Sequence, residues 1–274
     1  MLHFAVAGVP LSTPGAGGTV KGLRHAHSLG IRAMEIEWVQ RVPVNPERMA
    51  EIREVAEELE MYLTVHAPYY INLNTSEKEK MVASKKRIFD GLSMAELCGA
   101  QSVCVHPAFY QGKDAKEVYK TVLAAAEDIL KDKEKYFPNV NLAFETMGKG
   151  SQFGTIEELL ALSKHCKIYP CIDPAHMHAR TNGAWNTAKE WHHLFDLYEK
   201  ALGKKSLKKM HMHYSGIAYG PKGEKHHVPL QESDAKWVDF LKVLKEREIE
   251  GVVVCESPLL EDDTLLLQET FYTL

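Results

Sequence analysis

Short runs of apolar and β-branched residues alternate with segments of helical periodicity along the whole chain. In the segment Ser76–Gly99, for example, Ile88, Leu92 and Ala95 recur on one helical face. The apolar runs between such segments have the length of strands buried on both faces, as parallel strands are. We predict eight strands, at Leu2–Gly8, Arg32–Trp38, Tyr62–Pro68, Ser102–Pro107, Asn141–Thr146, Tyr169–Asp173, Lys208–Tyr214 and Gly251–Glu256.

Signals for helix ends lie between these strands. Ser76 and Thr155 each precede a glutamate by three residues, which is typical of the capping box at a helix start. Gly30 and Gly99 stand just before a predicted strand, and Gly251 stands at the start of one, where a glycine commonly ends the preceding helix. Strict alternation of strand and helix indicates a parallel sheet with right-handed crossovers.

Eight such units can close a barrel that leaves no edge strand. An open, doubly wound sheet is the competing architecture, and it usually carries a glycine-rich phosphate loop after its first strand. The loop Pro10–Gly18 lacks the G-x-G-x-x-G spacing, and no linker or low-complexity tract divides the chain. We therefore expect an α/β protein with one (β/α)8 TIM barrel, which forms a single domain over residues 1–274.

The composition narrows the classes of function. The formal net charge is −4, so a nucleic-acid site would have to be a local basic patch or depend on bound cations. The first residues lack the pattern of a signal peptide, and no stretch reaches the roughly 18 apolar residues of a membrane span. The five cysteines include no C-x-x-C pair, and three lie in apolar runs. We expect a cytosolic protein with reduced, buried thiols.

Ionisable side chains end six consecutive predicted strands. In a parallel barrel the catalytic groups lie at the C-terminal ends of the strands, so these side chains are expected to converge. A further pair lies in the long loop after the seventh strand, above the same end. The candidates are His66, His106, Glu145, Asp173, His176, His211, His213, Glu256 and the loop residues Glu224 and His226.

Each candidate alone has an ordinary structural explanation. A histidine at a strand end is more often a hydrogen-bonded structural residue than a ligand, and a carboxylate there can cap the next helix. Together, however, three carboxylates and several imidazoles would repel and desolvate one another unless divalent cations offset the cost. Mixed imidazole and carboxylate ligands suit Zn²⁺, Mn²⁺ or Fe²⁺. The number of ligands favours two or three ions with a bridging carboxylate.

The order of these residues resembles the endonuclease IV family of zinc-dependent apurinic/apyrimidinic endonucleases. The resemblance runs from about the second predicted strand to the eighth. It implies the same barrel and the hydrolysis of a DNA phosphodiester bond 5′ of an abasic site. The matching motifs are His66-Ala-Pro-Tyr69-Tyr70-Ile71-Asn72-Leu73, His106-Pro107, Glu145 with the loop to Gly154, Cys171-Ile172-Asp173-Pro-Ala-His176, Met210-His211 and Glu256.

The resemblance also implies three zinc ions and their ligands. Glu145, Asp173 and Glu256 would be the catalytic carboxylates, with Glu145 bridging two ions. Manganese or iron could replace zinc. The implied sets are His66, His106 and Glu145 for the first ion, Glu145, Asp173, His211 and Glu256 for the second, and His176, Glu224 and His226 for the third.

Two departures from the family pattern bear on these assignments. The family's Asp-x-His in the loop reads Glu224-Lys225-His226 here, and the longer glutamate could shift or weaken the third site. The family's Asn-Asp after the seventh-strand histidine is replaced by His213-Tyr214. His213 could be an added ligand, a group that supports a ligand, or a structural residue.

The implied partner is double-stranded DNA with an abasic site, bound by a monomer. Tyr69 matches a tyrosine that fills the gap left by a flipped nucleotide, and Tyr70 could stack on a base. Arg41 and Lys149 are the basic residues expected to contact the DNA. The lysine cluster Lys204–Lys209 precedes the seventh strand, so we expect it at the opposite end of the barrel, away from the site.

Two other functions remain open at this point. A metal-dependent sugar isomerase or epimerase on the same barrel would also place Glu, Asp and His at strand ends, around one or two ions. A barrel that binds damaged DNA or a metabolite without turnover is the non-catalytic alternative. The number of bound ions separates the first from the nuclease, and binding to abasic DNA without cleavage would favour the second.

Overall fold

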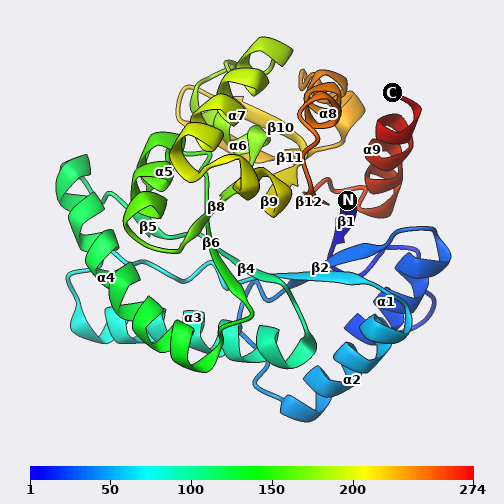
Figure 1. Ribbon diagram of the computed structural model, residues 1–274, viewed down its shortest axis with the longest axis horizontal. Helices are drawn as coiled ribbons and strands as arrows, with labels where there is room; N and C mark the ends of the chain where they lie inside the picture. The colour runs from blue at the N-terminus through cyan, green and yellow to red at the C-terminus, as the bar shows by residue number, and fades with distance from the viewer.

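Eight parallel strands close a barrel at the centre of the molecule, with helices around it (Figure 1). The computed structural model describes residues 1–274. The neighbour order is β1-β12-β9-β8-β6-β4-β3-β2, and β1 also pairs with β2. The barrel and all eight predicted strands are confirmed, with bounds that differ by at most two residues. The strands are β1 (Leu2–Ala7), β2 (Ala33–Glu37), β3 (Tyr62–His66), β4 (Ser102–Val105), β6 (Asn141–Glu145), β8 (Tyr169–Ile172), β9 (Met210–Tyr214) and β12 (Gly251–Cys255).

Every barrel strand is followed by at least one helix, as the alternating pattern predicts. The chain also contains two short 3-10 helices, at Lys204–Lys208 and Leu230–Glu232. No helix has both the length and the apolar character needed to cross a membrane. The α-helices are α1 (Thr19–Ser28), α2 (Pro46–Glu58), α3 (Lys78–Cys98), α4 (Ala115–Tyr136), α5 (Ile156–His165), α6 (Pro174–Arg180), α7 (Ala188–Leu202), α8 (Trp237–Glu246) and α9 (Glu261–Thr273).

Apolar side chains fill the space between the strands and the helices. Around α7 and α8 the contacts are mainly aromatic: the Phe240 ring stacks on Tyr214 at 4.9 Å and meets Trp191 edge-on at 5.4 Å. Such pairs add to the apolar area that they bury. All five cysteines are free, and four of them are buried, including Cys104, Cys171 and Cys255. The barrel wall is therefore a rigid support for the side chains at its two ends.

Of the two capping boxes predicted at helix starts, one is confirmed and the other is wrong. The capping box of α5 is confirmed, because the Thr155 hydroxyl accepts from the backbone of Glu158 and the Glu158 carboxylate accepts from the backbone of Thr155. The box predicted at Ser76 is wrong, since α3 begins only at Lys78 and has no side-chain cap. A second box at Thr187, at the start of α7, was not predicted.

The glycines before strands also differ from one another. Gly99 ends α3 in the left-handed conformation, as predicted, and Gly30 follows α1 with φ +89°. Gly251 does not end a helix, because α8 stops at Glu246 and Gly251 is the first residue of β12. Its φ is +119°, and a Cβ there would lie 2.0 Å from the carbonyl oxygen of Met210. No other residue fits this position without moving the strand.

One hairpin and one short antiparallel strand pair cover the C-terminal end of the barrel. The hairpin pairs β10 (Gly216–Gly220) with β11 (Gly223–Val228), so the long loop expected after the seventh strand carries two strands. A shorter pair joins β5 (Ala108–Phe109) to β7 (Gln152–Phe153). These additions bring the loops after β4, β6 and β9 close to the ends of the barrel strands.

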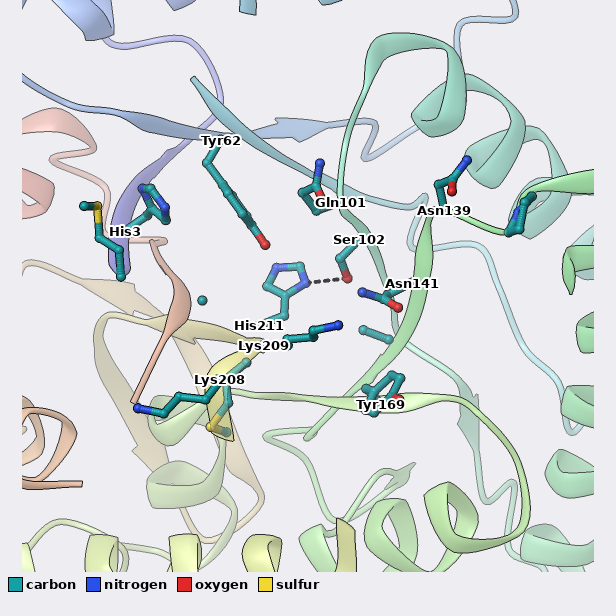
Figure 2. Close-up of a pocket in the computed structure, with 15 residues that line it drawn as sticks. His3, Tyr62, Gln101, Ser102, Asn139, Asn141, Tyr169, Lys208, Lys209 and His211 are labelled. Atoms are coloured by element: carbon teal, nitrogen blue, oxygen red, sulfur yellow. Dashed lines mark hydrogen bonds between the residues drawn. The ribbon is translucent and has the colours of Figure 1, made fainter. Parts of the chain in front are cut away.

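The N-terminal end of the barrel holds a pocket of about 440 Å³ (Figure 2). We call it the lower pocket. First or second residues of barrel strands line it, among them Tyr62, Ser102, Asn141, His211 and Gly251. Lys208 and Lys209 also line it, which confirms that the lysine cluster lies at the opposite end from the predicted site.

Candidate metal centre

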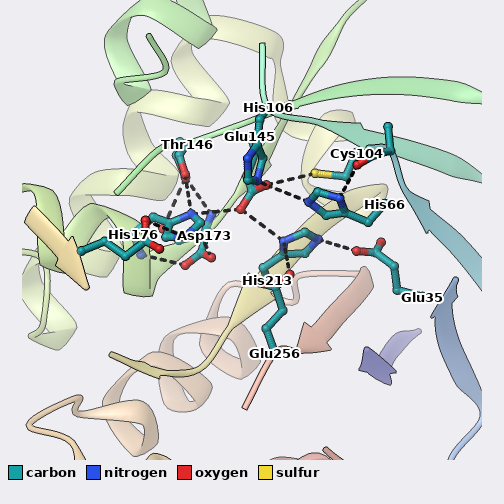
Figure 3. A network of polar contacts seen from close by, with 12 residues as sticks. Glu35, His66, Cys104, His106, Glu145, Thr146, Asp173, His176, His213 and Glu256 are labelled. Atoms are coloured by element: carbon teal, nitrogen blue, oxygen red, sulfur yellow. Dashed lines mark hydrogen bonds and ion pairs between the residues drawn. The ribbon is translucent and has the colours of Figure 1, made fainter. Parts of the chain in front are cut away.

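Glu145 is the centre of the cluster at the C-terminal end of the barrel (Figure 3). It is the last residue of β6, and its side chain is 0% exposed. Four imidazole nitrogens surround its carboxylate: His106 Nε2 at 2.8 Å, His176 Nδ1 at 3.0 Å, His213 Nδ1 at 3.3 Å and His66 Nε2 at 3.4 Å. Parallel strands end at the same side of the barrel, so side chains that are distant in sequence meet here.

Two further carboxylates complete this cluster. Asp173 caps α6, since its Oδ1 accepts from the backbone N–H of His176 at 2.8 Å and Pro174 occupies the first helical position. Glu256 follows β12, and its Oε1 lies 3.4 Å from Nδ1 of His213. Donor atoms of Glu145, Asp173, His213 and Glu256 all lie within 4.8 Å of one another. These four side chains can ligate one ion.

The two histidines of β9 lie at different depths in the barrel. They are two residues apart on a strand, so both point to its interior. His213 reaches Glu145, whereas His211 lies deeper, with Nε2 2.8 Å from Glu35 and Nδ1 3.0 Å from the Ser102 hydroxyl. The structure therefore does not bring His211 to the carboxylates at the top, and His213 stands where the resemblance had implied His211.

The strand β2 contributes two carboxylates that sequence reasoning missed. Oε1 of Glu35, which is fully buried, lies 2.9 Å from Nε2 of His213. Burial alone raises the pKa of Glu35, but the charges of His213 and His211 outweigh it and hold the pKa well below its usual range. Burial raises the pKa of Glu37 to about 8. Their spacing, Glu35-Ile-Glu37, is the signal that could have revealed them, because alternate residues of a strand share a face.

The hairpin after β9 presents Glu224 to the site but not His226. The spacing Glu224-x-His226 predicts one shared strand face, yet the pairing register shifts between Ala218 and Tyr219, and Lys225 becomes an extra, bulged residue. The bulge reverses the alternation. His226 is exposed, and the next residue turns inward instead.

That next residue, His227, lies over the cluster. Its Nδ1 is 3.9 Å from Oε2 of Glu256, and donor atoms of Asp173, His176 and His227 lie within 4.8 Å of one another. Oε2 of Glu224 is 3.6 Å from Nε2 of His176. The side chains near His176 are therefore Glu224 and His227, and His227 was not among the ligands expected from the sequence.

Burial and charge act against each other throughout the cluster. Burial raises the pKa of Glu145, but the charges of His106 and His213 bring it well below the usual range. For His66 burial lowers the pKa, whereas the close contact with the Glu145 carboxylate and the charge of Glu37 raise it to about 10. Such large opposed shifts are typical of functional sites.

Several buried polar atoms of the cluster lie close to groups of opposite charge but make no well-aligned hydrogen bond. They include Nε2 of His66, Oε1 of Glu145, Oδ2 of Asp173 and both ring nitrogens of His213. Buried polar atoms are normally paired, so an unpaired group of this kind indicates another binding partner. Imidazole nitrogens and carboxylate oxygens are the donors that Zn²⁺, Mn²⁺ and Fe²⁺ prefer. The residues therefore fit a site for such ions.

A cleft of about 300 Å³ opens above the cluster, and we call it the upper cleft. Of the residues predicted to contact DNA, Tyr69 and Lys149 line it. Tyr69 is 47% exposed. Its ring packs against the rings of His66 and His106, with ring centroids 5.2 and 5.1 Å apart. Tyr70 and Arg41 are exposed but do not line the cleft. The lining residues are Tyr69, His106, Phe109, Met147, Lys149, Gln152, His176, Glu224, His227 and Glu256.

Comparison with protein families assigns the architecture. Residues 23–270 match the model of a family described as a xylose isomerase-like TIM barrel. An uncharacterised protein of Methanocaldococcus jannaschii is 38% identical over 271 residues, which cover 99% of this chain and 97% of that protein. A probable endonuclease 4 of Shouchella clausii is 26% identical over 171 residues. That match covers 60% of this chain and only 56% of the relative's length.

Solved structures show the same fold with different functions. A D-tagatose 3-epimerase-like protein has a TM-score of 0.74 at 18% identity and covers 98% of this chain and 96% of its own. Endonuclease IV from Thermus thermophilus has a TM-score of 0.70 at 22% identity, with 98% and 99% covered. At such identities the likeness establishes the barrel alone, because one fold supports many chemistries.

Proposed function

Because the chain belongs to the xylose isomerase-like TIM barrel family, we propose that it is a metal-dependent hydrolase that cleaves DNA phosphodiester bonds 5′ of abasic sites. The observation that carries this proposal is the number of donor groups around Glu145. There are more donor groups than one ion can use as ligands, and the groups extend along the upper cleft to His176, Glu224 and His227. The similarity to probable endonuclease 4 proteins supports the choice of substrate.

The proposed ligands follow the geometry and form three sets. His213 and His227 take the roles that the resemblance had implied for His211 and His226. When bound, divalent ions would supply Lewis-acid chemistry, placing positive charge beside a phosphoryl group and activating water. The sets are His66, His106 and Glu145; Glu145, Asp173, His213 and Glu256; and His176, Glu224 and His227.

The remaining side chains of the upper cleft would position the substrate. Lys149, whose Nζ lies 4.0 Å from Oε1 of Glu224, is half-exposed and can turn to a DNA phosphate. The exposed face of Tyr69 can stack on a base beside the site. The Glu256 carboxylate lines the cleft and is placed to accept a proton from water there. The sequence-based expectations of a monomer and of a cytosolic location belong to the same proposal.

The direct test is incubation with a duplex that carries one abasic site, compared with the intact duplex. We expect incision on the 5′ side of the abasic site by protein loaded with Zn²⁺ or Mn²⁺, and its loss when a chelator is added. Metal-loaded protein that leaves the abasic duplex uncut would contradict the proposal. If it still bound that duplex without cutting it, the non-catalytic alternative would hold.

Sugar epimerisation is the second candidate, and one observation favours it. Glu145, Asp173, His213 and Glu256 can hold a single ion without the other histidines, and a D-tagatose 3-epimerase-like protein shares the fold. The number of ions per chain distinguishes the two functions. Three ions per chain support the hydrolase, whereas a single ion with conversion of D-tagatose, measured by chromatography, supports the epimerase.

A further inference from the structure

The lower pocket is larger than the upper cleft and lies at the other end of the barrel. Their volumes are about 440 and 300 Å³. The lower pocket exists because small residues occupy the barrel floor: Ser102 and Ala143 line it, and Gly251 has no side chain. Its volume falls in the range of small-molecule sites, which is about 300–1,000 Å³.

The wall of the lower pocket is polar but contains no carboxylate. It presents the amides of Gln101, Asn139 and Asn141 and the phenols of Tyr62 and Tyr169. The Tyr62 ring is half-buried and stacks on His3 at 4.8 Å with an angle of 19° between the rings. Amide and phenol groups of this kind can donate to and accept from the hydroxyls of a sugar.

The charges of the lower pocket favour an anion. Lys208 is neutralised by Glu250, with Nζ 3.1 Å from the carboxylate, whereas Lys209 makes no salt bridge. Figure 2 shows the Lys209 side chain beside His211, with its amino group directed toward Asn141 and Ser102. An unpaired ammonium next to neutral donors is the arrangement that a phosphate group needs.

His211 closes the floor of the pocket and does not reach Glu145, Asp173 or Glu256 at the top. Its ring is 6% exposed and is held by Ser102 on one nitrogen and by Glu35 on the other, at 3.0 and 2.8 Å. The negative charge of Glu35 lies behind the imidazole, outside the lining of the pocket. The floor is therefore a fixed, hydrogen-bonding surface that screens a ligand from the carboxylates above.

We propose that the lower pocket binds a small phosphorylated sugar, with the phosphate beside Lys209 and Asn141 and the sugar hydroxyls on the amide and phenol groups. This site is separate from the proposed metal centre and does not depend on the function proposed for it. Two sources share this chemistry, a free sugar phosphate and a nucleoside monophosphate, and the choice of probes separates them.

The test is calorimetric titration of the metal-loaded protein with ribose 5-phosphate and with dAMP, with ribose and inorganic phosphate as reference probes. We expect at least one phosphorylated sugar to bind, ribose not to bind measurably and phosphate to bind more weakly. Lys209→Glu should weaken binding about tenfold or more, because a charge-assisted hydrogen bond to the phosphate is replaced by charge repulsion. Lys209 is exposed, so this variant should fold.

The matched control is Lys149→Glu, the same charge reversal at the upper cleft. It should leave the binding of ribose 5-phosphate and dAMP unchanged if these probes occupy the lower pocket. The proposal is overturned if neither phosphorylated sugar binds, or if inorganic phosphate binds as tightly as they do. It is also overturned if Lys149→Glu abolishes binding while Lys209→Glu leaves it intact.

Discussion

The two ends of the barrel are built from the same strands but carry opposite chemistry. At the C-terminal end, buried carboxylates and imidazoles meet around Glu145 within hydrogen-bonding distances. At the N-terminal end, the lower pocket offers amides, phenols and lysines, with no carboxylate in its lining. The upper end needs cations to offset its charge, whereas the lower end can accept an anion.

The position of a residue along its strand therefore decides which end of the barrel it serves. His211 and His213 share one strand and one face, and only two residues separate them. His213 lies 3.3 Å from Glu145, while His211 forms the floor of the lower pocket. Glu35 lies between them and contacts both. Substitutions at each end can show how independent the two ends are.

The largest effect is expected for Glu145→Gln. This substitution keeps the shape of the side chain but removes the charge that four imidazoles surround, so metal binding should fail. We expect a loss of incision of about 10³-fold, the upper range for removing one group that stabilises a transition state, together with a lower metal content by mass spectrometry. The exposed Lys204, at the other end, provides the control Lys204→Gln. Unchanged metal content in Glu145→Gln would refute the central position of this carboxylate.

A pair of neighbouring histidines gives the next largest contrast. His227→Ala should lower incision about 10²-fold, because a group near His176 that helps to stabilise transition-state charge is lost. His226→Ala should leave activity close to that of the unmodified protein, since His226 is exposed on the other side of the bulge. Both variants should be compared by single-turnover kinetics on the abasic duplex. Equal losses in the two variants would mean that the bulge does not decide which histidine serves the site.

Glu35→Gln tests the connection between the two ends. The carboxylate fixes the Nε2 side of His213, so that Nδ1 is directed to Glu145 and Glu256. Partners of this kind usually change metal affinity by about 10- to 100-fold when they are mutated. We expect a reduction of that size in competition with a fluorescent chelator, with the number of sites unchanged. An affinity equal to that of the unmodified protein would show that His213 needs no such support.

Much of this architecture could be predicted from the sequence, because patterns among residues close together in the chain determine it. The eight apolar runs with intervening helical periodicity predicted the barrel, and the residues that end those runs, such as His66 and Glu145, were expected at one end. The direction of parallel strands alone places them there. Glu35 and Glu37 were within reach of the same reasoning, since they alternate along β2 in the same way.

Other features depend on pairing that no local pattern reveals. Which of His211 and His213 reaches Glu145 depends on the stagger of β9 against its neighbours, because both point inward. The bulge at Lys225 exists only in the register between β10 and β11, so the Glu224-x-His226 spacing misled the assignment of the hairpin. The lower pocket likewise arises from residues spread over the first positions of several strands, none of which is distinctive alone.

The smallest effect is expected for Ser102→Ala, which alters the lower end without touching the upper one. The Ser102 hydroxyl is buried and pairs with Nδ1 of His211 at 3.0 Å. Its removal should cost about 1 kcal/mol of the free energy of unfolding, the usual net value of one hydrogen bond, measured by urea denaturation of the metal-loaded protein. The affinity for metal should change less than in Glu35→Gln, because Glu35 still holds the other nitrogen of His211 and keeps its own contact with His213. A loss of metal affinity as large as that in Glu35→Gln would show instead that the barrel floor and the candidate metal centre act as one unit.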